Sequence, residues 1–209
     1  MAVIGLVHGI GGTAATMAPL ADLLRAAGHT VEAVTLPGHG TDPDDLVGVG
    51  WSDWLAAVPD AEVLVGQSMG ATLALTVAAL NSHVRVVVAI NPPMADEDAL
   101  EGLQWRQSRG HEWVDGPELG DGEVGYTRFP ITAFIEMLEG VHAADLDAVT
   151  APVLLVRGAL DDSADDMAFD VLADNLGGPV QRLVLPHSGH VATSGPDLAL
   201  VVAAIDELL

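Results

Sequence analysis

The 209-residue sequence has no cysteine and no lysine, and only 4% of its residues are aromatic. The absence of cysteine excludes disulfide bonds, a thiol nucleophile and thiolate metal sites, and it gives no sign of an oxidising compartment. Seven arginines oppose 30 acidic residues, so the formal net charge is −23 at pH 7. A surface of this sign repels nucleic acid and anionic membranes, and we expect neither as a partner.

The acidic excess has two explanations, and the composition leaves both open. One is adaptation to a salty cytoplasm, in which dissolved salt screens the repulsion between carboxylates. The other is a GC-rich genome that avoids lysine codons. Folding that depends on molar salt would favour the first explanation, and stability that is independent of salt would favour the second.

Two segments, residues 1–21 and 63–84, contain no charged residue and are long enough for a membrane span or a signal peptide. The first has no basic residues ahead of its apolar run and contains the stretch HGIGG. The second is interrupted by the stretches GQSMG and NSH. Both patterns are typical of a buried strand followed by a helix, so we expect a cytoplasmic protein without membrane insertion.

Short apolar runs alternate with helical patterns along most of the chain. Runs that are apolar throughout are typical of strands buried on both faces, and the alternation favours parallel pairing with right-handed crossovers. We predict an α/β fold with about six mostly parallel strands and helices on both faces. The strands are expected at residues 2–7, 31–36, 61–65, 84–90, 153–156 and 180–185, and the helices at 17–27, 51–58, 71–80, 165–176 and 198–209.

Residues 93–150 break this alternation. They show no strand signal, and apolar residues recur at helical spacing only from residue 131 to residue 141. We interpret this segment as a cap or lid inserted into a core of residues 1–92 and 151–209. The alternative is a small second core without a ligand. Five of the eight aromatic residues lie in the segment, and we expect them to line a pocket for an apolar substrate: Trp105, Trp113, Tyr126, Phe129 and Phe134.

Polar residues follow several of the predicted strands. The stretch HGIGG follows the first strand, GQSMG follows the strand at 61–65, GALDD follows the strand at 153–156, and HSGH follows the last strand. Ligands bind parallel sheets beyond the carboxyl ends of the strands. A serine, an aspartate and a histidine are therefore expected at one edge of the sheet.

Ser68 lies between Gly66 and Gly70 in GQSMG, a pattern that is a weak signal by itself. A serine hydroxyl needs a histidine to accept its proton, and a carboxylate orients that histidine. The two glycines permit a sharp turn from strand to helix. Backbone N–H groups must also stabilise the oxyanion of the tetrahedral intermediate. We predict these donors at Met69 and, in the glycine-rich loop after the first strand, at Ile10.

Six stretches spread over nearly the whole chain resemble the α/β-hydrolase family, and within it the bacterial carboxylesterase and monoacylglycerol lipase branch. They are HGIGGT, LPGHGT, DWLAAV, GQSMGATLAL, PVLLVRGALDD and SGHVAT. The resemblance implies the α/β-hydrolase fold, a catalytic triad of Ser68, Asp161 and His190, and the same two oxyanion donors. The first half of the cap departs from the family in having few long aliphatic side chains.

Neighbouring residues offer alternatives to two members of this triad. The family places its acid three residues after the glycine that ends the strand, which favours Asp161 over Asp162. His187 and His190 are spaced like a pair of metal ligands, but such pairs belong on a helix and no third ligand is evident. We therefore expect no metal and no cofactor. His190 precedes a run of small residues that can pack near the site, and His187 is interpreted as structural.

These residues predict a serine hydrolase that cleaves a small-molecule carboxylic ester of short to medium acyl chain through an acyl-enzyme intermediate. The same triad would serve the hydrolysis of thioesters, amides or carbon–carbon bonds, because this fold hosts all of these reactions. A third possibility is a non-catalytic homologue that binds a small apolar ligand. The natural substrate and the oligomeric state do not follow from the sequence.

Overall fold

A parallel sheet forms the centre of the fold. The computed structural model describes residues 1–117, 124–162 and 166–209. In these residues six strands lie side by side, each parallel to its neighbours, in the order β2-β1-β3-β4-β7-β8. The predicted sheet is thus confirmed. Its strands are Thr30–Ala33 (β2), Val3–Val7 (β1), Val63–Gln67 (β3), Val86–Ile90 (β4), Val153–Gly158 (β7) and Val180–Leu185 (β8).

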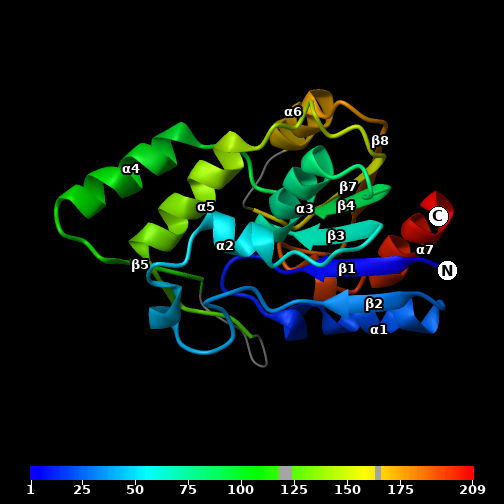
Figure 1. The fold of residues 1–209 in the computed structure, drawn as a ribbon, viewed down its shortest axis with the longest axis horizontal. Helices are drawn as coiled ribbons and strands as arrows, with labels where there is room; N and C mark the ends of the chain where they lie inside the picture. The colour runs from blue at the N-terminus through cyan, green and yellow to red at the C-terminus, as the bar shows by residue number, and fades with distance from the viewer. Residues whose placement is uncertain (118–123, 163–165) are drawn as a thin grey trace.

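Helices cover both faces of this sheet (Figure 1). Ala18–Ala26 (α1) and Leu198–Leu208 (α7) pack on one face, and Met69–Leu80 (α3) and Asp166–Asn175 (α6) pack on the other. Successive side chains of a strand point to opposite faces. Val63 and Val65 of β3 therefore belong to the core on the side of α1 and α7, whereas Leu64 belongs to the core on the side of α3 and α6. Burial on both faces explains why the strands are apolar throughout.

The strands end where their pairing with neighbouring strands ends. This is not always where the apolar run in the sequence ends. β3 extends to Gln67, two residues beyond the predicted end, because Gly66 pairs with β1 and Gln67 pairs with β4. β2 stops at Ala33, short of the predicted end, because only Thr30–Ala33 pair with β1. Trp51–Ala56 (α2) confirms the short helix predicted there, and 3₁₀ helices span Ala14–Met17, Pro43–Leu46 and Ala192–Ser194.

The segment 93–150 contains more secondary structure than the sequence predicted. Ile131–Ala143 (α5) confirms the expected helix, but Glu97–Ser108 (α4) was not predicted. The interpretation that this segment lacks strands is wrong, because Trp113–Asp115 (β5) and Arg128–Pro130 (β6) form an antiparallel pair. A strand of three residues is too short to show apolar alternation. Similarly, α4 contains no fully buried residue, and only Leu100 and Leu103 pack partly buried against the core, so its apolar pattern is weak.

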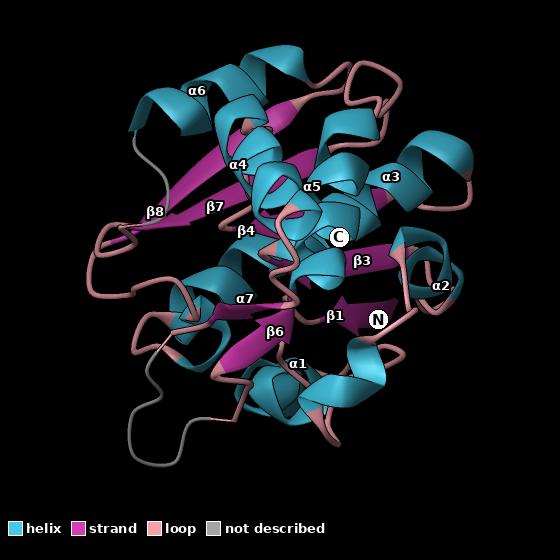
Figure 2. Cartoon of the chain, turned by 90° about the vertical axis from the view of Figure 1, so that its left-hand side faces the viewer, coloured by secondary structure: helices cyan, strands magenta, loops and turns pink. Residues whose placement is uncertain are grey.

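The elements of this segment lie beyond the carboxyl ends of the parallel strands. Figure 1 shows α4 and α5 on that side of the sheet, and Figure 2, viewed from that end, shows both helices in front of it. α5 is joined closely to the core. The carboxylate of Glu136 accepts a hydrogen bond of 3.0 Å from the backbone N–H of Trp51, the first residue of α2. Gly140 lies against the Trp51 ring, where a Cβ atom would come within 2.0 Å.

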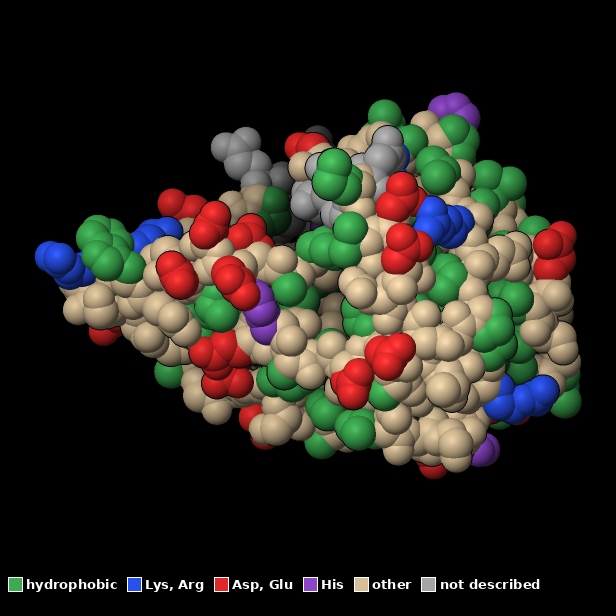
Figure 3. Space-filling model, turned by 90° about the horizontal axis from the view of Figure 1, so that it is seen from above, with side chains coloured by type: hydrophobic (Ala, Val, Ile, Leu, Met, Phe, Trp, Pro, Cys, Tyr) green, Lys and Arg blue, Asp and Glu red, His purple; other side chains and the backbone are tan. Residues whose placement is uncertain are grey.

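The described surface agrees with the acidic composition. Acidic side chains are scattered over the face seen in Figure 3, and basic side chains on it are few. In the three described ranges, no helix has the length and apolar character that crossing a membrane requires.

Candidate active site

Ser68 occupies a sharp turn between strand β3 and helix α3. It is the single residue between Gln67, which ends β3, and Met69, which begins α3. Its φ of 54° and ψ of −127° are rare for a residue with a side chain. Two hydrogen bonds hold this conformation. The backbone N–H of Ser68 donates to the carbonyl oxygen of Ile90 at 2.9 Å, and its own carbonyl oxygen accepts from Ala71 at 2.8 Å.

The two glycines around Ser68 allow this turn to form. A Cβ atom on Gly66 would lie 2.1 Å from the carbonyl oxygen of Gly70, and one on Gly70 would lie 2.3 Å from the carbonyl oxygen of Val7 in β1. Both neighbours are backbone atoms, which cannot move aside as a flexible side chain could. The glycines therefore bring the first turn of α3 directly against the ends of β1 and β3.

Asp161 and His190 approach Ser68 from two other segments. Asp161 is buried shortly after the end of β7, and its backbone N–H donates to the carbonyl oxygen of Gly158 at 3.1 Å. His190 follows β8. Its Nδ1 lies 2.9 Å from Oδ2 of Asp161, and its Nε2 lies 3.1 Å from Oγ of Ser68. Asp162, the alternative acid, is exposed.

These distances give each ring nitrogen of His190 a defined role in hydrogen bonding. A carboxylate only accepts hydrogen bonds, so Nδ1 carries the proton in the contact with Asp161. In the neutral ring Nε2 then has the lone pair and is able to accept from the hydroxyl of Ser68. The His190 side chain is 37% exposed, whereas that of Asp161 is 1% exposed. Solvent therefore reaches the imidazole while the carboxylate is shielded.

The loop that carries His190 is held by buried polar side chains. Asp197 accepts hydrogen bonds of 2.8 Å from the backbone N–H of His187 and from the hydroxyl of Ser188. Burial raises the pKa of the Asp197 carboxyl, but these hydrogen bonds and the nearby His187 imidazole outweigh it, and the net pKa is lowered. The Thr193 hydroxyl lies 3.0 Å from the side-chain oxygen of Gln67, which ties the loop to the residue before Ser68.

The loop after β1 runs against Ser68 on its other side. A Cβ atom on Gly9 would lie 2.9 Å from Cβ of Ser68 and 3.4 Å from its Oγ. His8 fixes this loop, because its Nδ1 donates to the carbonyl oxygen of Gly9 at 2.7 Å and its Nε2 accepts from the backbone N–H of Leu36 at 3.0 Å. In a trans peptide the C=O and N–H groups point in opposite directions. The contact to His8 thus turns the N–H of Ile10 away from His8.

Burial keeps the His8 imidazole neutral. It is the main reason that the pKa of His8 is lowered from 6.5 to about 4, and it outweighs the opposing effect of the hydrogen bond to Gly9. The neighbouring His39 lowers the pKa of His8 further, and burial lowers the pKa of His39 as well. The hydrogen bonds that His8 makes require the neutral ring, since its Nε2 accepts.

The five aromatic residues of the predicted cap occupy different environments. Tyr126 and Phe129 are buried against loops of the core, and Trp113 lies under the guanidinium group of Arg128 at 4.4 Å. Phe134 contacts Phe129 edge to face, with ring centroids 5.0 Å apart. Trp105 is 59% exposed. Contact of these residues with a substrate stays a prediction.

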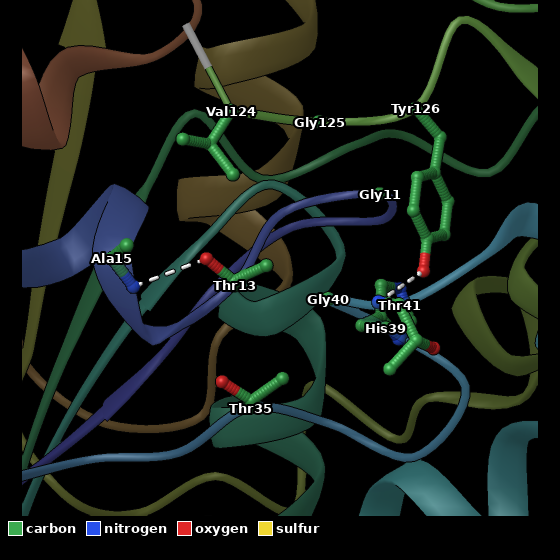
Figure 4. A pocket seen from close by; sticks show the side chains of 10 residues that line it. All are labelled: Gly11, Thr13, Ala15, Thr35, His39, Gly40, Thr41, Val124, Gly125 and Tyr126. Carbon is green, nitrogen blue, oxygen red and sulfur yellow. Dashed lines mark hydrogen bonds between the residues drawn. The ribbon is translucent and has the colours of Figure 1, made fainter.

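Tyr126 borders a hollow of about 560 Å³ that lies among three loops (Figure 4). Its hydroxyl accepts from the backbone N–H of Thr41, drawn as a dashed line in Figure 4, and donates to the carbonyl oxygen of Gly38, both at 3.1 Å. Gly11 and Thr13 also line the hollow, whereas the three residues of the predicted triad do not. The hydroxyl of Ser68 is thus not part of the lining of this hollow.

Comparison with known proteins identifies the family. A model of the alpha/beta hydrolase family matches residues 6–203. The chain belongs to the alpha/beta hydrolase family. It is 27% identical over 217 residues to the thermostable monoacylglycerol lipase of Bacillus sp. (strain H-257), and the match covers 94% of this chain and 86% of that protein.

Solved structures share the fold of this α/β-hydrolase. One comes from work on LipS and LipT, two metagenome-derived lipolytic enzymes. It is 24% identical with a TM-score of 0.87, over 99% of this chain and 92% of that chain. Another is the monoacylglycerol lipase of Paleococcus ferrophilus, 17% identical with a TM-score of 0.72, over 99% of this chain and 94% of that chain. These structures show the same fold as this chain, and the α/β-hydrolase family predicted from the sequence is confirmed.

Sequence reasoning missed Asn91 and Asp197, two buried side chains that form hydrogen bonds to the loop of His190. Asn91 directly follows β4 and so lies at the same edge of the sheet as Ser68 and Asp161. The criterion that selected Ser68, a polar residue directly after an apolar strand, also applies to Asn91. Asp197 follows no strand, and its spacing offers no comparable signal.

Proposed function

We propose that this α/β-hydrolase is a serine hydrolase that cleaves carboxylic esters of short to medium acyl chain through an acyl-enzyme intermediate. The observation that carries the proposal is the continuous hydrogen-bonded path from the hydroxyl of Ser68 through His190 to the buried carboxylate of Asp161. The names of the relatives, a monoacylglycerol lipase and lipolytic enzymes, support an ester as the substrate.

The first half of the reaction forms the acyl-enzyme. Oγ of Ser68 attacks the ester carbonyl carbon while Nε2 of His190 takes the hydroxyl proton. Asp161 keeps Nδ1 protonated and stabilises the imidazolium that forms. The backbone N–H groups of Ile10 and Met69 stabilise the negative carbonyl oxygen of the tetrahedral intermediate. The intermediate collapses when Nε2 gives its proton to the leaving alcohol, and the acyl group stays on Ser68.

The second half of the reaction repeats these steps with water. His190 accepts a proton from water, the resulting oxygen nucleophile attacks the acyl carbon, and the second tetrahedral intermediate is stabilised by the same backbone donors. Collapse of this intermediate releases the carboxylic acid and returns the proton to Ser68. The His190 side chain is partly exposed, so water has access to the imidazole, whereas Asp161 is buried and only orients the ring.

The proposal is tested with p-nitrophenyl esters from acetate to palmitate. We expect the highest kcat/KM with short to medium chains and a loss of about a thousandfold or more in kcat for Ser68→Ala. Ser82→Ala is the matched control, because Ser82 is exposed. A fluorophosphonate probe should label the wild-type protein with one equivalent and leave Ser68→Ala unlabelled.

Two results would contradict the proposal. Unchanged turnover in Ser68→Ala would mean that Ser68 is not the nucleophile. Failure of the probe to label the folded wild-type protein would favour a non-catalytic ligand-binding protein. Thioester and anilide substrates with the same acyl group test the bond that is cleaved, and we expect the ester to have the highest kcat/KM of the three.

A further inference from the structure

The end of β4 touches all three segments that carry the predicted triad. The carbonyl oxygen of Ile90 accepts from the backbone N–H of Ser68 at 2.9 Å. The next residue, Asn91, donates its own backbone N–H to Val156 of β7 at 2.9 Å. Its side-chain amide reaches the loop of His190. A single dipeptide therefore connects the nucleophile turn, the strand before the acid and the histidine loop.

The side-chain amide of Asn91 forms three hydrogen bonds. Oδ1 accepts from the backbone N–H of Gly158 at 2.8 Å, at the point where β7 ends. Nδ2 donates to the carbonyl oxygens of Gly189 and His190, at 3.1 Å and 2.7 Å. Both protons of the NH₂ group and one lone pair of the oxygen are thereby used. Asn91 is only 4% exposed, so its partners are shielded from competing water.

We propose that Asn91 is a positioning residue for ester hydrolysis, which holds His190 within hydrogen-bond reach of both Ser68 and Asp161. This inference rests on the proposed function. The amide acts on the backbone of His190 and not on the imidazole that moves the protons. Because Oδ1 also fixes Gly158, whose carbonyl oxygen holds the N–H of Asp161, the same side chain sets the spacing between the base and the acid.

This part of the loop is closely packed on its carbonyl side and loosely packed on the other. A Cβ atom on Gly158 would lie 2.5 Å from the carbonyl oxygen of Ser188 and 2.6 Å from that of Gly189. A Cβ atom on Gly189 would meet a single neighbour within 4 Å, the carbonyl oxygen of Leu160 at 3.6 Å. The side chain of His190 is partly exposed, so burial does little to fix it. Without the amide of Asn91, the backbone at residues 189 and 190 loses two hydrogen bonds from the core, and the imidazole can drift from Ser68.

Asparagine suits this position for two independent reasons. The φ of Asn91 is 45°, in the left-handed region that asparagine adopts more readily than most residues with side chains. The position also needs two donors and one acceptor at the end of a short side chain. Aspartate has the same shape but no donors, so its carboxylate would face two carbonyl oxygens. Glycine accepts the backbone conformation but provides no amide.

The test compares Asn91→Asp and Asn91→Gly with the wild-type protein. Concentrations are set by fluorophosphonate titration, so that only folded, reactive molecules are counted. We expect kcat to fall about a hundredfold in both variants while KM for a p-nitrophenyl ester stays within about twofold, because the side chain of Asn91 contacts only Gly158 and the histidine loop, so that the substitution displaces the base. The second-order rate of labelling by the probe should fall with kcat.

Asn81→Asp is the matched control. Asn81 is exposed at the end of α3 remote from Ser68, and its side-chain oxygen accepts from the N–H of His83, a contact that aspartate retains. It should keep the wild-type kcat. A purely structural role for Asn91 would lower the melting temperature or the titrated fraction without changing kcat per active site, and that outcome would overturn the inference.

Wild-type kcat in Asn91→Gly would also overturn it, even if Asn91→Asp is inactive, because the loss would then come from the added carboxylate. If Asn91→Asp does not fold, Asn91→Gly alone decides. Failure of the proposed function is recognised separately, because Ser68→Ala would then keep its turnover whatever the Asn91 variants do.

Discussion

The buried His8 makes the stability of this α/β-hydrolase depend on pH in a way that one substitution can isolate. The His8 pKa is about 4 in the folded protein, against an ordinary value of 6.5. The unfolded chain therefore binds a proton at His8 between these two values while the folded protein does not. The stability that the protein has while His8 is neutral in both the folded and the unfolded state is present in full above pH 6.5. It is lost as the pH falls towards 4, because only the unfolded chain then gains the proton.

The size of the effect follows from the difference between the two pKa values. That difference, from 6.5 to about 4, corresponds to about 3 kcal/mol of unfolding free energy. Between pH 7.5 and 4.5 the protein should lose about 2.5 kcal/mol through His8 alone. Other groups titrate in the same range, so the measured quantity must be a difference between two proteins.

The measurement is urea-induced unfolding of the wild-type protein and of His8→Asn at both pH values. Asparagine has no titrating group there, so the stability advantage of the wild-type protein should shrink by about 2.5 kcal/mol on acidification. His111→Asn, at an exposed position, is the control and should leave the pH dependence nearly unchanged. A stability difference between wild type and His8→Asn that stays constant from pH 7.5 to 4.5 would refute the reasoning.

Two further substitutions test the surroundings of Ser68. Gly9→Ala places a methyl group 2.9 Å from Cβ of Ser68, and we expect kcat/KM to fall by about a hundredfold or more because the oxyanion donors are displaced. Gly102→Ala in α4 is the control, because a Cβ atom there meets nothing within 4 Å. It should keep its activity and gain about 0.5–1 kcal/mol of stability. Equal activity in the two variants would contradict the expected role of the loop after β1. Asp161→Asn should lower kcat by about a thousandfold or more in steady-state kinetics, whereas Asp162→Asn should keep a kcat near the wild-type value. The reverse result would identify Asp162 as the acid of the triad.

The core of the fold was predictable because its strands are buried on both faces. Such strands give apolar runs that stand out in the sequence, and strand–helix alternation then restricts the topology to a parallel sheet. That a serine, an aspartate and a histidine lie beyond one edge of the sheet was predictable for the same reason, whereas the choice of Asp161 over Asp162 rested on the resemblance to the family. Ser68 follows β3 and Asp161 follows β7, and both strands belong to one parallel sheet. Parallel pairing brings the carboxyl ends of its strands to the same edge.

The segment from residue 93 to residue 150 was less predictable because short elements leave weak patterns. The β5–β6 pair consists of two three-residue strands, and α4 carries no buried side chain. Their stability comes from contacts with α5 and with the core, which no local window of sequence contains. The three bonds of Asn91 are likewise long-range, because two of its partners lie about a hundred residues further along the chain.

The contact between Glu136 and Trp51 bears on how separable the cap and the core are. The acceptor for the first N–H group of helix α2 comes from a side chain of α5, and the Trp51 ring rests on the bare backbone of Gly140. Removing residues 93–150 would take away the acceptor of the Trp51 backbone N–H and would expose the face of the Trp51 ring that lies on Gly140. Residues 93–150 and the core thus share a hydrogen bond and a close ring contact, and grafting this segment onto another scaffold would require transplanting α2 along with it.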